Sequence, residues 1–211
     1  TALLHSSIVA EKRDTLKAWT ILLAIVAFSF SLLGTFIVRS GVLISVHAFA
    51  SDPSRGLYIL MLLIFFTGGA LILFAKKAAY LKSGSLFQPL SREGALVINN
   101  IIFASSAATV LLGTLYPIFI DAINNSKVSV GPPYFEAVFI PLMVPALLLC
   151  AFSPMLSWKR AKLENILERV IAVFILSILS TAILVFIYGG SSSAFLGLFL
   201  GIWLILGTVY E

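Results

Sequence analysis

The sequence predicts an all-α protein, a polytopic bundle of transmembrane helices. Hydrophobic residues make up 60% of the chain, charged residues only 11%, and the mean hydropathy is +1.09. Soluble domains contain about 45–50% apolar and about 25% charged residues, so this chain has too few charges to cover a soluble core. The apolar residues also form runs long enough to cross a bilayer. The basic residues are concentrated in every second loop between these runs.

Six segments have the length of a transmembrane helix, which needs roughly 17–25 largely apolar residues. None of the six contains Lys, Arg, Asp or Glu. The segments are Ala18–Val38, Leu57–Ala75, Ala95–Tyr116, Ala137–Leu156, Val170–Tyr188 and Ala194–Val209. The opening stretch Thr1–Ala10 is apolar but too short to span, and we expect it to be the end of a truncated helix. Residues 1–211 are thus predicted to be a single transmembrane domain.

The basic residues between the spans predict the orientation. Of the 14 Lys and Arg residues, eleven lie in three alternate loops: the one before the first span (Lys12 to Lys17), the one after the second (Lys76 to Arg92) and the one after the fourth (Lys159 to Arg169). The remaining loops contain three. Loops rich in Lys and Arg stay in the cytoplasm, so 39–55 and 117–136 are predicted to be outer-face loops. The basic residues form no cluster suited to nucleic acid.

Proline and cap residues mark the ends of the spans. Asp52 followed by Pro53 predicts the N-cap and first residue of a helix. Pro117 is predicted to end the third span, because proline lacks the N–H that a helix interior needs. Pro141 and Pro145 lie inside the fourth span, where neighbouring helices make kinks tolerable.

Several residues are expected to serve packing rather than chemistry. Cys150 is the only cysteine and lies in an apolar run, which favours an inert thiol. The pair Gly68-Gly69 predicts close helix packing, and Asn99 predicts an interhelical hydrogen bond. No spacing of Cys and His suits a zinc site, and no residue is assigned a catalytic role.

The two histidines are the residues that indicate chemistry. His5 is six residues before Glu11, which places it roughly 9 Å inside the cytoplasmic boundary of its helix. An ionisable residue at that depth is a functional hypothesis by default. Two interpretations remain open: a neutral histidine bonded to a neighbouring helix, or an axial ligand to the iron of a membrane haem.

His47 lies in Gly41–Ala50, which is too apolar for a solvated linker and too short to span. This segment is predicted to lie along the membrane interface, with Arg39 and Arg55 flanking it. The histidine is either a ligand to haem iron, with the two arginines meeting the haem propionates, or a hydrated interfacial residue whose arginines face lipid phosphates.

The residues around His47 resemble a known family. The resemblance begins at Gly34–Leu43 (GTFIVRSGVL) and continues through Ser45–Ala50 (SVHAFA) and Asp52–Gly56 (DPSRG). Further matches are Thr1–Ser6, Ser91-Arg92-Glu93 with Asn99-Asn100, Leu112–Pro117 and Val130–Phe135. The sequence is similar to the CcmF family, the haem-lyase subunits of the bacterial cytochrome c maturation system, which also occurs in plant mitochondria. The match is dense over residues 1–160.

The resemblance implies a function with its cofactors and partners. Haem would arrive on a haem chaperone, and thiol-handling subunits would present apocytochrome c for attachment of haem to its CXXCH motif. His5 would be a ligand of a resident haem b within the membrane, and His47 a ligand of the haem in transit. The protein would lie in the bacterial inner membrane, with the His47 loop in the periplasm, or in the mitochondrial inner membrane.

Two other classes of protein remain as alternatives: a secondary transporter or channel subunit, and a structural membrane subunit without haem. Transporters commonly place ionisable residues near the middle of the membrane, and these spans carry none apart from His5 nearer one edge. Haem absorption bands in the full-length parent would distinguish a lyase from both.

Overall fold

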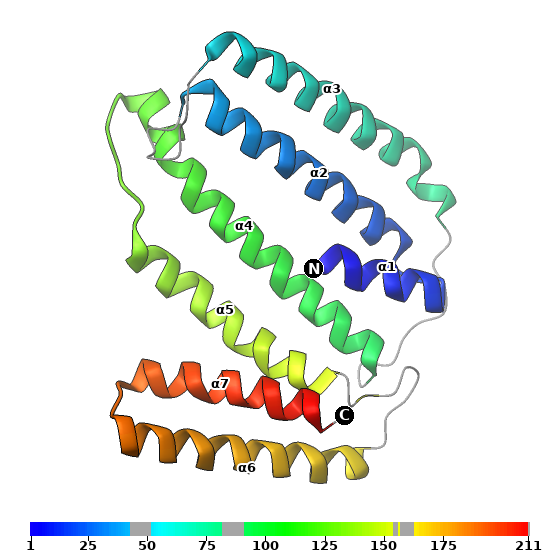
Figure 1. The fold of residues 1–211 in the computed structure, drawn as a ribbon. Coiled ribbons are helices and arrows are strands. Elements are labelled where there is room, and N and C mark those ends of the chain that lie inside the picture. Colours follow the sequence, from blue (N-terminus) through cyan, green and yellow to red (C-terminus); the bar gives the residue numbers. More distant parts are fainter. Residues whose placement is uncertain (43–51, 82–90, 154–155, 157–162, 211) are drawn as a thin grey trace. The chain divides into compact units, whose positions relative to one another are not determined.

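The structure is a computed structural model that describes residues 1–42, 52–81, 91–153, 156 and 163–210, without the side chains of 163–166. Within these ranges it is helical and contains no strand, which confirms the predicted fold class (Figure 1). The α-helices are α1 (Ala2–Arg13), α2 (Lys17–Ser40), α3 (Pro53–Lys77), α4 (Arg92–Asn124), α5 (Pro132–Phe152), α6 (Leu163–Tyr188) and α7 (Ser192–Val209).

Six of these helices, α2 to α7, are long and apolar enough to cross a membrane. Each of the six predicted spans coincides with one of them, although the helix ends differ from the predicted ends. The opening stretch forms the short helix α1, which ends at Arg13 because Asp14 adopts a left-handed conformation (φ 56°). The arrangement is that of a multi-pass membrane protein.

Helix α4 continues through Pro117 to Asn124, so the prediction that Pro117 ends the helix is wrong. Proline removes one N–H from the helix and crowds the carbonyl four residues earlier, which here belongs to Gly113. The predicted loop 117–136 is therefore helical at both ends: α4 extends to Asn124, and α5 begins at Pro132.

Helix α5 packs against the turn that precedes Pro117. The Tyr134 hydroxyl donates a hydrogen bond to the Thr109 carbonyl at 3.1 Å. A Cβ added to Gly113 would lie 2.5 Å from Cε1 of Tyr134, so the tyrosine ring occupies the space that a larger residue would need. This packing supports the helix where proline weakens it, as neighbouring helices commonly do in membranes.

The first compact unit comprises Thr1–Ser85 and Thr114–Val130. Within it, α2 and α3 run side by side as an antiparallel hairpin (Figure 1). The hydroxyls of Ser29 and Thr67 are hydrogen-bonded across the pair at 2.8 Å. The adjacent rings of Phe28 and Phe66 meet edge to face, with centroids 6.3 Å apart.

The described residues place no helix against Gly68-Gly69, so the prediction of close packing there stays untested. Among these residues, a Cβ added to either glycine would meet no atom within 4 Å. The contact with α2 is made by the preceding residue, Thr67, so the two glycines lie on faces of α3 that do not touch α2.

The second unit comprises Leu86–Gly113 and Gly131–Glu211. Its core is formed by Ala151, Val173 and Trp203, from α5, α6 and α7. The indole N–H of Trp203 donates to the Leu148 carbonyl at 3.2 Å, which satisfies the polar group of a buried aromatic residue.

Helix α7 lies very close to α5. A Cβ added to Gly207 of α7 would lie 2.8 Å from Cβ and 3.2 Å from the carbonyl oxygen of Ala151. Small residues at helix contacts allow this approach in membrane proteins.

Asn99 joins α4 to α5, which confirms its prediction as an interhelical hydrogen-bonding residue. Its side-chain amide donates to Sγ of Cys150 at 3.6 Å, and Asn99 is buried. The thiol of Cys150 is free and only partly buried, and it contributes to the contact between these two helices.

Candidate functional site

The candidate site lies where the α2–α3 hairpin turns. Helix α2 ends just after Arg39, because Gly41 adopts a left-handed conformation (φ 74°) that other residues rarely tolerate. Helix α3 begins at Pro53 with Asp52 as its N-cap, whose Oδ1 accepts a hydrogen bond from the Arg55 backbone N–H at 3.2 Å. The predicted cap is therefore confirmed.

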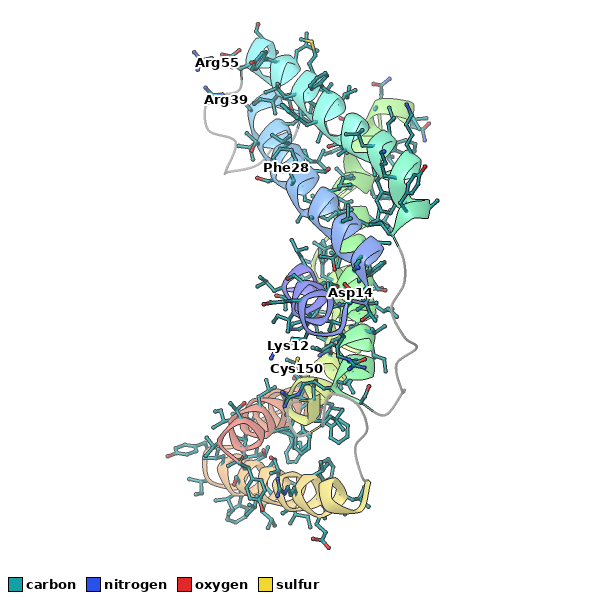
Figure 2. The ribbon with its side chains drawn as sticks, turned by 90° about the vertical axis from the view of Figure 1, so that its right-hand side faces the viewer. Lys12, Asp14, Phe28, Arg39, Arg55 and Cys150 are labelled. Carbon is teal, nitrogen blue, oxygen red and sulfur yellow. The ribbon has the colours of Figure 1, made fainter. Side chains whose placement is uncertain are left out.

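Asp52 also ties the two helix ends together. Its backbone N–H donates to the carbonyl of Arg39 at 3.0 Å, and its Oδ2 lies 3.2 Å from Nε of Arg55. A little further along α3, a Cβ on Gly56 would lie 2.8 Å from Cα of Ser40, so the two backbones are nearly in contact. The close approach of the backbones fixes Arg39 and Arg55 at the same end of the hairpin (Figure 2).

The two arginines differ in exposure: the side chain of Arg55 is exposed, and Arg39 is partly buried. The side chain of Arg55 is 70% exposed although it is paired with Asp52. Arg39 makes no ion pair with any residue that the structure describes. Guanidinium groups bind carboxylates and phosphates through planar, paired hydrogen bonds, so this end of the hairpin is suited to an anion.

His47 lies in the segment 43–51, outside the described residues. The structure therefore fixes the two ends of the predicted loop 39–55 and leaves the predicted interfacial position of His47 untested. The structure brings Arg39 and Arg55 to the same end of the hairpin, whereas their predicted role in meeting the propionates of a haem bound by His47 is untested.

His5 lies in the middle of α1 and is partly buried. Its neighbours Ser6 and Val9 are fully buried, whereas Leu4 and Ile8 are exposed, so α1 has one covered face and one open face. The imidazole lies in the part of α1 that precedes its charged end Glu11–Arg13, in surroundings compatible with a neutral axial ligand.

The residues that the structure describes are compatible with haem as a ligand. Across the described part of the chain, no three His, Cys, Asp or Glu side chains come together as a metal ion would need. Haem iron is held by its porphyrin and takes only axial ligands from the protein, so a single histidine at each place is compatible with it. The propionates are carboxylates, which match the arginine pair.

Asp52 has a double role that its sequence context predicted only in part. The residue was expected to be a helix cap, and its carboxylate also pairs with Arg55. The ion pair could have been predicted from the spacing of Asp52 and Arg55, because side chains three residues apart on a helix are neighbours.

Comparisons with known proteins agree over the whole chain. No family model matches. The cytochrome c-type biogenesis protein CycK of Rhizobium meliloti is 53% identical over 212 residues, which cover 100% of this chain and 31% of that protein. CcmF of Pseudomonas aeruginosa, also a cytochrome c-type biogenesis protein, is 47% identical over 207 residues, covering 98% of this chain and 32% of that protein.

A solved structure gives the same result for the fold. The cytochrome c haem lyase CcmF superposes with a TM-score of 0.71 and 28% identity, over 99% of this chain and 30% of that one. The chain spans about a third of the length of the curated relatives that it matches. Over its entire length, this chain belongs to the CcmF and CycK family of cytochrome c-type biogenesis proteins.

Proposed function

We propose that this chain is part of a haem lyase subunit, which handles haem at the outer face of the membrane for covalent attachment to apocytochrome c. The observation that carries the proposal is the identity along the whole chain to cytochrome c-type biogenesis proteins. The arginine pair supports it, because the pair stands at the two ends of the segment that contains His47.

In this proposal His47, Arg39 and Arg55 hold the haem in transit, which is the substrate. His47 binds the iron through a neutral imidazole, and the two guanidinium groups bind the propionates. With both contacts made, the ring is oriented while its vinyl groups stay accessible to the two thiols of a CXXCH motif. Each thioether bond forms when one thiol adds across one vinyl group, the sulfur and the hydrogen going to adjacent carbons.

His5 is proposed as one axial ligand of a resident haem b within the membrane. Its position on an apolar, partly covered helix supports a neutral imidazole, the form that binds iron. When bound, this haem would supply electrons that keep the incoming haem iron reduced. The contribution of the chain is to hold the imidazole at a depth where it stays uncharged.

The proposed partners and location follow from the same family membership. A haem chaperone delivers the substrate, and thiol-handling subunits present the apocytochrome. The protein lies in the bacterial inner membrane, or in that of mitochondria, with loops 39–55 and 117–136 on the outer face. The excess of Lys and Arg in the other loops supports this orientation.

Absorption spectroscopy of the purified full-length parent tests the proposal. A haem lyase shows haem bands as isolated and forms covalent cytochrome c when supplied with haem and apocytochrome. A parent protein without haem bands, or one whose deletion leaves cytochrome c maturation intact, would show that the chain belongs to a transporter or a structural subunit.

A further inference from the structure

We propose that Asp52 sets the charge of the anion-binding pair formed by Arg39 and Arg55, so that haem is held loosely enough to be passed on. The inference rests on the proposed function, because it takes the haem propionates as the anion. It assigns to Asp52 a role in releasing the substrate, in addition to its role in capping α3.

The contacts of Asp52 give the two arginines different electrostatic environments. Both oxygens of its carboxylate interact with Arg55: Oδ1 accepts a hydrogen bond from the backbone N–H, and Oδ2 pairs with the guanidinium. Arg39 receives only a backbone contact, from the Asp52 N–H to its carbonyl. The positive charge of Arg55 is therefore largely balanced, whereas no carboxylate of the described residues pairs with Arg39.

Asp52 is the acidic residue closest in the sequence to the two arginines. Asp52 is the single Asp or Glu between Asp14 and Glu93, so the whole segment around both arginines contains one negative charge. The group of Arg39, Asp52 and Arg55 consequently has a net charge of +1. Without the carboxylate it would have +2, which would match two ionised propionates.

A binding site for a substrate in transit must release as well as bind. Full charge matching would strengthen the attraction to the two propionates and slow dissociation. One charge a few ångströms away in a solvated setting changes an equilibrium by on the order of fivefold. Asp52 lies within this distance of Arg55 in the structure.

The substitution Asp52→Asn removes the negative charge and keeps a side chain that can cap α3. Asparagine caps a helix as well as aspartate does, so α3 still begins at Pro53, but the charge is lost. The full-length parent, isolated with its partner subunits, is loaded with haem, and release to excess apomyoglobin is timed. The same measurement on the parent carrying His47→Gly gives the amount of haem that is bound elsewhere than at the outer site, and this amount is subtracted.

Asp52→Asn is expected to slow haem release by on the order of fivefold. The double variant Asp52→Asn with Arg55→Gln should release haem faster than Asp52→Asn alone, since it lowers the net charge from +2 to +1 and removes one of the two groups that bind the propionates. Haem dimethyl ester, which lacks ionised propionates, should leave wild type and Asp52→Asn equally fast.

The matched control is Asp14→Asn at the other end of α2. Asp14 pairs with Lys17 at 2.7 Å, so this variant also breaks an exposed ion pair between residues three apart, but far from the arginines (Figure 2). It should leave haem release unchanged.

The outcomes separate this inference from the proposed function. Release from Asp52→Asn at the wild-type rate would overturn the inference, because the carboxylate would then be only a cap. Faster release would also overturn it, because Asp52 would then be positioning Arg55 on the ligand. If wild type takes up no haem, or releases haem and its dimethyl ester equally fast, the proposed propionate site itself is wrong.

Discussion

Asp52 shows how much one side chain contributes to this hairpin. It caps α3, pairs with Arg55, and donates its backbone N–H to the Arg39 carbonyl. The ion pair alone is exposed and is worth only about 0–1 kcal/mol of stability. The importance of the carboxylate is therefore expected in the charge presented to a ligand more than in folding.

His47 offers a test of the ligand role at the residue scale. Replacing it by Gly leaves a hole about the size of imidazole, and an outer-face site would admit that solute. Cytochrome c formation by His47→Gly should fall and should recover with millimolar imidazole, because a neutral imidazole can fill an open iron position. Covalent haem in cytochrome c measures both effects, and His47→Ala serves as the parallel variant.

A hydrated interfacial histidine predicts a different result. His47→Gly would then only weaken the local backbone, by roughly 1 kcal/mol at most, and imidazole would have no effect. Normal maturation in both variants would refute the ligand role.

His5→Ala in the full-length parent should lower the content of resident haem while the protein still inserts. One axial ligand is lost, whereas alanine is the best helix former, so α1 should persist. The haem-to-protein ratio and the absorption spectrum of the purified variant measure the effect. An unchanged spectrum would show that His5 only packs between helices.

The contact of α7 with α5 makes a prediction at the scale of the element. Gly207→Ala should destabilise the protein by roughly 1–3 kcal/mol, because the added methyl group meets the backbone of Ala151, which cannot easily move aside. Unfolding of the purified chain in detergent, followed by circular dichroism, gives the change in stability.

Gly201→Ala is the control within the same helix. A Cβ at this position meets no atom within 4 Å, so the variant should be neutral or should gain roughly 0.5–1 kcal/mol from the better helix propensity of alanine. Equal effects at the two positions would contradict the close approach of α5 and α7.

The helices could be predicted from sequence because long apolar runs have few alternatives in a membrane. Their contacts could not, because composition does not say which face of a helix meets a neighbour. Gly68-Gly69 suggested packing and does not contact α2, whereas Gly207 was not singled out and makes a very close contact with α5. Pro117 misled for a related reason: Tyr134 packs against the turn of α4 that contains Thr109 and Gly113, before the proline, and this contact depends on a different helix.

At the scale of the whole molecule, the distribution of basic residues predicts which loops face outward. In a Cys150→Ala background, a cysteine at Ser126 should react with an impermeant thiol reagent in intact cells, and a cysteine at Ser83 should not. The reverse pattern would place the His47 segment in the cytoplasm and would refute both the topology and the outer site.

The candidate site was only partly predictable for a physical reason. Two arginines around a histidine were visible in the sequence, and Asp52 was recognisable as a cap. The pairing of Asp52 with Arg55, and its backbone contact with Arg39, depend on how closely two helix ends meet. That distance is set by Gly56 against Ser40, a contact between residues that carry no recognisable chemistry.

Three contacts outside the segment 43–51 join the helices of the α2–α3 hairpin. They are Ser29 with Thr67, Gly56 with Ser40, and Asp52 with Arg39. Because these contacts hold the two helix ends together, we expect the hairpin to tolerate a longer connection: a linker of twice the length costs only about 0.6 kcal/mol more in closure entropy. We therefore expect that a different ligand-binding sequence can be grafted between the two arginines.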